Sequence, residues 1–94
     1  MNKDLLEGLF NELYEIVEND ECRRNVYDFE WLNENEFLIK EKIHSQRKVF
    51  LIYYDNENDT FNIYIQANWT YKYTKKTYKT KRGAFKYVSK QIAW

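Results

Sequence analysis

The spacing of apolar residues changes twice along this 94-residue chain, and these changes restrict how it can fold. From about residue 4 to residue 19, apolar residues recur three or four positions apart, which is the period of an amphipathic helix. Between Val26 and Thr70, apolar and polar residues largely alternate, as they do in half-buried strands. The helical period returns after Thr80. The sequence therefore predicts one helix, a group of strands and a second helix, in that order.

Short polar segments divide the alternating part into four predicted strands. These strands cover residues 26–31, 37–44, 48–54 and 60–70. Short polar links such as Ser45-Gln46 join neighbouring antiparallel strands, so the sheet should be a meander. Asn19 to Asn25 is the expected break between the first helix and the first strand. The segment from Tyr71 to Lys79 either extends the fourth strand or forms a mobile loop.

These elements predict one small α+β domain that spans residues 1–94, in the order α-β-β-β-β-α. With 44% apolar and 19% aromatic residues, a chain of this length can bury a core and is typical of a single domain. Both helices are expected on one face of the antiparallel sheet, with the other face partly open. Thr80 is the expected N-cap of the second helix.

Charge is distributed unevenly, although the formal net charge is zero. All fifteen acidic residues precede position 60, and eight lysines or arginines follow it. Residues 1–36 contain three Lys or Arg against eleven Asp or Glu, which is a net charge of −8, whereas residues 60–94 carry +8. Because the positive segment also holds half of the aromatic residues, it has the cations and flat rings that contact phosphates and stack on bases.

The first functional hypothesis is therefore a non-enzymatic binding protein whose basic, tyrosine-rich C-terminal half engages an anionic partner, with nucleic acid as the favoured partner. A competing interpretation is that the lysines keep an edge strand soluble and unpaired. The predicted nucleic-acid-binding residues are Trp69, Tyr71, Lys72, Tyr73, Lys75, Lys76, Tyr78, Lys79, Lys81, Arg82, Lys86 and Lys90.

The second hypothesis is a small protein-binding inhibitor or adaptor, such as an anti-defence protein of a phage or another mobile element. The acidic first helix would then imitate nucleic-acid phosphates in the channel of a nucleic-acid-processing protein. The residues assigned to this role are Glu7, Glu12, Glu15, Glu18, Asp20 and Glu21. A homo-oligomer in which acidic and basic surfaces of neighbouring chains meet is a third hypothesis, and an enzyme ranks fourth.

Residues that carry common catalytic and cofactor chemistry are scarce. His44 is the single histidine, Cys22 is the single cysteine, and the two glycines, Gly8 and Gly83, do not form a phosphate-binding loop. We therefore expect no catalytic residues, no metal and no cofactor. The longest apolar run, Val49 to Tyr54, is much shorter than the ~20 residues of a membrane span. Without such a run or a secretion signal, we expect a cytoplasmic protein that does not enter membranes.

Overall fold

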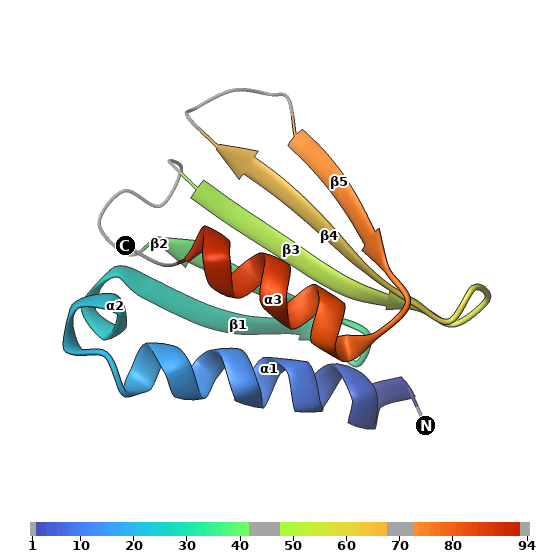
Figure 1. Cartoon of the computed structure of the whole chain (residues 1–94), viewed down its shortest axis with the longest axis horizontal. Helices are drawn as coiled ribbons and strands as arrows, with labels where there is room; N and C mark the ends of the chain where they lie inside the picture. The colour runs from blue at the N-terminus through green and yellow to red at the C-terminus, as the bar shows by residue number, and fades with distance from the viewer. Residues whose placement is uncertain (1, 42–47, 68–72, 93–94) are drawn as a thin grey trace.

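The computed structural model describes residues 2–41, 48–67 and 73–92 (Figure 1). Along the chain the elements are α1 (Asn2–Glu18), α2 (Glu21–Val26), β1 (Tyr27–Asn33), β2 (Glu36–Glu41), β3 (Lys48–Asp55), β4 (Thr60–Ala67), β5 (Tyr73–Tyr78) and α3 (Lys81–Gln91). The radius of gyration, 12.6 Å, is close to the ~12 Å expected for one folded domain of this length.

The five strands form one antiparallel sheet in the order β1-β2-β3-β4-β5, which confirms the predicted meander. Asparagine shapes the tight turn between β1 and β2. The side-chain oxygen of Asn33 accepts a 2.8 Å hydrogen bond from the backbone N–H of Asn35, and its amide donates to Glu36 at 2.6 Å. The Asn33 side chain therefore gives the Asn35 N–H a hydrogen-bond partner at a position where the strands do not pair.

Both long helices, α1 and α3, lie side by side on the same face of the sheet, as predicted (Figure 1). Alternate residues of the central strands point toward them and form the core together with one side of each helix. Core residues with no exposed surface are Leu6, Leu9 and Leu13 of α1, Phe37 and Ile39 of β2, Phe50 and Ile52 of β3, Ile63 of β4, and Ala84, Val88 and Ile92 in and just after α3.

The described residues contain five strands, one more than the predicted four. Strand β5 lies in the segment for which the sequence left open an extension of the preceding strand or a loop, and it pairs with β4 from Tyr78 opposite Phe61 to Tyr73 opposite Gln66. An edge strand has one neighbour, and most described side chains of β5 are exposed, so β5 needs no alternating apolar pattern. This explains why periodicity did not reveal it.

A short helix, α2, occupies the predicted break between Asn19 and Asn25. The Asp20 side chain caps it by accepting hydrogen bonds from the N–H groups of Cys22 and Arg23, at 3.0 and 3.3 Å. None of its residues is buried, so it carries no apolar period. Two predicted strand ends lie outside the described residues: residues 42–44, which include His44, and residues 68–70.

Candidate nucleic-acid interface

The predicted site extends over the end of β4, strand β5 and helix α3. Trp69, Tyr71 and Lys72 lie outside the described residues, as does the side chain of Tyr73. The eight other predicted residues are described, and they separate into groups with different surroundings.

Strand alternation places the two neighbouring lysines of β5 on opposite faces of the sheet. Lys76 pairs in register with Ile63, whose side chain is buried beneath the helices, so Lys76 belongs to the helix side. Lys75 pairs with Tyr64, and its ammonium nitrogen lies 5.6 Å from the centre of the Tyr64 ring on the other face. We call this face, opposite the helices, the open face. The predicted cations therefore do not form one continuous patch.

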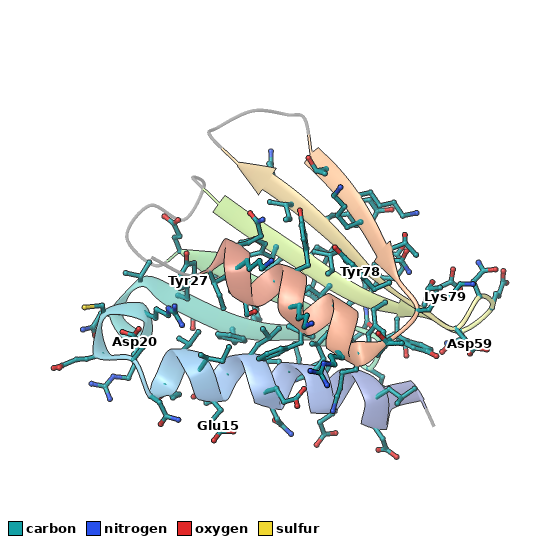
Figure 2. The ribbon with its side chains drawn as sticks, viewed as in Figure 1. Glu15, Asp20, Tyr27, Asp59, Tyr78 and Lys79 are labelled. Atoms are coloured by element: carbon teal, nitrogen blue, oxygen red, sulfur yellow. The ribbon has the colours of Figure 1, made fainter. Side chains whose placement is uncertain are left out.

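Helix α3 presents three cations along its outer side. Arg82, Lys86 and Lys90 are exposed and recur every four residues. They lie opposite the buried side of the helix, which Ala84 and Val88 occupy. Lys79 is exposed at the corner where β5 ends and α3 begins (Figure 2), and Lys76 is exposed on the helix side of β5. We call these five residues, Lys76, Lys79, Arg82, Lys86 and Lys90, the cationic ridge.

The start of α3 is held by Thr80, as predicted. The Thr80 hydroxyl accepts a 3.1 Å hydrogen bond from the N–H of Gly83. This bond uses one of the first-turn donors that a phosphate would otherwise contact. The N–H of Ala84 is also occupied, because it donates to the Thr80 carbonyl at 3.2 Å.

Two of the predicted residues make contacts that separate them from the ridge. Tyr78 packs against Tyr87 of α3, with ring centres 5.6 Å apart, and it lies against the hydrophobic core. Lys81 turns toward α1 and forms an ion pair with Glu12, with a nitrogen–oxygen distance of 3.4 Å. Both side chains thus help to join α3 to the rest of the fold.

The positive and negative parts of the sequence are neighbours in the helical layer, where α1 packs beside α3, but they lie apart at the two edges of the sheet. Strands β1 and β5 are opposite edges of the sheet, about 19 Å apart at ~4.8 Å per strand. This exceeds the Debye length of ~8 Å at physiological salt. Glu15 extends from α1 away from α3 (Figure 2). Among the ion pairs of the described residues, Lys81–Glu12 joins α1 to α3, and none involves a ridge residue.

The residues of the protein-binding hypothesis also divide into two groups. Glu7, Glu15, Glu18 and Glu21 are exposed, and the first three lie along the outer side of α1. Glu12 is paired with Lys81, as described above. Asp20 caps α2 and forms a 3.5 Å ion pair with Arg23. Asp20 therefore has a structural role that the sequence did not reveal.

On the open face, sequence reasoning missed a tyrosine pair, Tyr53 and Tyr64. Their rings stack with centres 5.7 Å apart at an angle of 11°, and their hydroxyl oxygens are 3.4 Å apart. Tyr64 falls in the polar phase of its strand, with Asn62 and Gln66, and an aromatic at such an outward position is the available signal. Tyr53 lies in the uninterrupted apolar run of Val49 to Tyr54 and gives no such signal. The pair and Lys75 together make a flat, polar-tipped surface.

The two hydroxyls of this pair differ in acidity. The hydrogen bond from Tyr53, and then the positive charge of Lys75, lower the pKa of Tyr64. The same hydrogen bond, followed by burial, raises the pKa of Tyr53 to about 12. Tyr64 therefore loses its proton first, because the hydrogen bond with Tyr53 and then the charge of Lys75 stabilise its anion.

Comparison of the chain with known protein families, curated proteins and solved structures finds no match. The assignment of the interface therefore depends on geometry and charge. Within residues 2–41, 48–67 and 73–92, no helix has both the length and the apolar character needed to cross a membrane.

Proposed function

We propose that this protein binds nucleic acid, without catalysing a reaction, by contacting phosphates with the cationic ridge. The observation that carries the proposal is the placement of the five ridge cations. All five are exposed, three of them along the outer side of α3 and two on β5 and at the corner that leads into α3. They take part in none of the ion pairs found among the described residues. Unpaired, clustered cations attract a polyanion and release its counterions on binding.

The spacing of the ridge suits a phosphate backbone. Arg82 and Lys90 are separated by about 12 Å along the α3 axis, at ~1.5 Å per residue. Double-stranded DNA carries one charge per ~1.7 Å of axis, so each ridge side chain has a phosphate within reach. Phosphate contacts carry no sequence information, and we therefore expect binding with little sequence preference.

The salt dependence of binding tests this proposal. Five phosphate contacts predict a slope of log affinity against log salt of about −4.5 on duplex DNA and about −3.5 on a single strand. Fluorescence anisotropy with labelled single- and double-stranded DNA and RNA, across a salt series, measures the slope and the preferred form. A wild-type protein that binds none of these at about 50 mM salt would contradict the proposal.

Charge reversal identifies the surface responsible. The triple variant Arg82→Glu, Lys86→Glu, Lys90→Glu should lose nucleic-acid binding while keeping its fold, because all three side chains are exposed. The matched control is Glu7→Lys, Glu15→Lys, Glu18→Lys on α1, which also reverses three exposed charges. The control should bind at least as tightly as the wild type. Equal loss in both variants would show that the ridge is not the contact surface.

The second candidate function, protein binding through α1, is favoured by the exposed line of Glu7, Glu15 and Glu18. In this case the wild-type protein would not bind nucleic acid itself. It would instead compete with DNA for a cationic nucleic-acid-processing protein. The same α1 triple variant would then abolish the competition, whereas the ridge variant would retain it.

A further inference from the structure

The open face of the sheet carries a regular grid of side chains that the cationic ridge does not use. The backbone register aligns one residue from each strand across the sheet. The middle row of this grid is Glu30, Leu38, Leu51, Tyr64 and Lys75, in the order β1 to β5.

This row changes from acidic to apolar to basic across the sheet. Leu38, Leu51 and Tyr64, with neighbouring Val49 and Gln66, line a shallow hollow of about 410 Å³. At the β1 edge, the Glu30 side chain is 54% exposed, and its carboxylate forms a 3.6 Å ion pair with Lys40 of β2. At the β5 edge, Lys75 is exposed. The apolar part therefore lies over the central strand, with opposite charges on its two sides.

Such a row is complementary to itself. When a second copy is turned over by a two-fold axis along β3, the middle row meets the same row in reverse order. Leu51 then lies on the partner's Leu51, and Leu38 lies on the partner's Tyr64. Glu30 lies on the partner's Lys75 on one side, and the reciprocal pair forms on the other. This is the isologous contact that two-fold symmetry requires.

The twist of the sheet favours contact along this row. Twisted sheets that pack face to face lie ~10 Å apart, and their corners separate while the middle stays close. The ends of the middle row remain near the contact plane. Glutamate and lysine side chains are long enough to meet across this distance.

The other two-fold arrangement is disfavoured by charge. An axis perpendicular to the strands would place Glu30 on the partner's Glu30 and Lys75 on the partner's Lys75. Like charges in these positions cost several kcal/mol and suppress the wrong orientation.

We propose that the open face binds the open face of a second copy of this chain, about a two-fold axis along β3. The five strands are about 24 Å wide, and the middle row with one further row on each side of it is about 20 Å long. The contact is therefore roughly 1,000 Å² in total, counted over both copies. This is the lower limit for a specific interface, so the dimer should be weak and dependent on concentration. The two helical layers, and both cationic ridges, face outward in this dimer. The inference does not rest on the proposed nucleic-acid binding.

Sedimentation velocity over a concentration series tests the proposal. The wild type should shift from monomer to dimer in the micromolar range. Lys75→Glu alone should raise the dimer dissociation constant at least about tenfold, because it places like charges together twice per dimer. Glu30→Lys, which also breaks the ion pair with Lys40 within each chain, should raise it at least as much. An equimolar mixture of these two variants should recover the wild-type constant, because both contacts are again between opposite charges.

The controls separate this interface from other outcomes. Glu15→Lys and Lys86→Glu reverse exposed charges on the helix side and should leave the dimer constant unchanged. A wild type that remains monomeric up to about millimolar concentration would overturn the proposal. So would single reversals without effect, or a mixture that fails to recover. A monomer whose open face binds single-stranded nucleic acid, with Lys75→Glu weakening that binding, would also overturn it.

Discussion

The two faces of the sheet are built from the same strands but have opposite chemistry. In β3, Phe50 and Ile52 point under the helices and have no exposed surface, whereas Leu51 and Tyr53 lie on the open face and are half-buried. The covered face contains apolar side chains that hold the fold together. The open face mixes leucine, tyrosine and charge. Alternation thus lets one strand contribute to stability with every second residue and to surface recognition with the others.

The largest difference between the faces should appear in stability. Phe50→Ala removes a fully buried ring from the covered face and should lower the free energy of unfolding by ~3–5 kcal/mol. Leu51→Ala, one residue along on the open face, should cost ~1 kcal/mol or less, because its side chain is already partly exposed. Urea denaturation at low protein concentration compares the two variants. Similar losses would mean that the open face is part of the core.

A smaller effect is expected where the chain passes from β5 to the helix that covers the sheet. Thr80→Ala removes the hydroxyl that accepts the Gly83 N–H and should cost ~1 kcal/mol. Ser89→Ala is the matched control, because the Ser89 hydroxyl donates to the Lys86 carbonyl within the helix and caps no terminus. Thermal unfolding should move for the first variant and remain nearly constant for the second. A shift of equal size in both would contradict the capping role.

The two faces should also differ in their contribution to nucleic-acid binding. Lys86→Ala removes one ridge cation and should reduce the magnitude of the salt slope by about 1. Lys75→Ala, on the open face, should leave the slope unchanged. Anisotropy titrations at several salt concentrations measure both slopes. A reduced slope for Lys75→Ala would assign the open face, rather than the ridge, to the phosphate backbone.

The smallest expected effect is on the free energy of unfolding at alkaline pH. Burial, and then the charge of Glu41, raise the pKa of Tyr27 above its ordinary value of 10.0. A group whose pKa is raised by folding stabilises the protein below its unfolded pKa, and this stability is lost as pH rises through the folded pKa. Stability should therefore fall above about pH 10, and Tyr27→Phe should reduce that fall.

On the open face the two tyrosines act in opposite directions. The raised pKa of Tyr53, about 12, makes stability fall between about pH 10 and 12, whereas the lowered pKa of Tyr64 adds stability at high pH. Tyr53→Phe should therefore reduce the loss of stability at high pH, whereas Tyr64→Phe should increase it. Tyrosinate absorbance and denaturation curves between about pH 8 and 12, on either side of the ordinary tyrosine pKa of about 10, measure both effects. A change in the same direction in both variants would contradict the opposite shifts.

Periodicity in the sequence predicted those helices and strands that bury one side against the core, and these elements define the fold class. Helix α1, strands β1 to β4 and helix α3 each have apolar residues facing the core, and each was predicted within a few residues of its bounds where these are described. Strand β5 and helix α2 were not recognised as separate elements. Apart from Tyr78, the described side chains of β5 are exposed, and α2 has no buried residue, so neither element leaves an apolar signature in the sequence.

The candidate site was less predictable than the fold. Charge composition pointed to the C-terminal half, but adjacent residues there have different surroundings: Lys75 contacts Tyr64, Lys76 lies on the helix side, and Lys81 pairs with Glu12. Tyr64 was not singled out at all. Its role depends on Tyr53 and Lys75, which come from neighbouring strands.

The sequence by itself determined which side of each long helix and of the central strands faces the core, and where the two charged segments lie, because these follow from the period and identity of residues along the chain. Tertiary structure decided which charges are neighbours and which face each tyrosine occupies. The physical reason is that pairing across a sheet and packing between helices join residues far apart in the chain. Lys81 meets Glu12, and Glu30 and Lys75 become opposite ends of one row, only after the strands are in register.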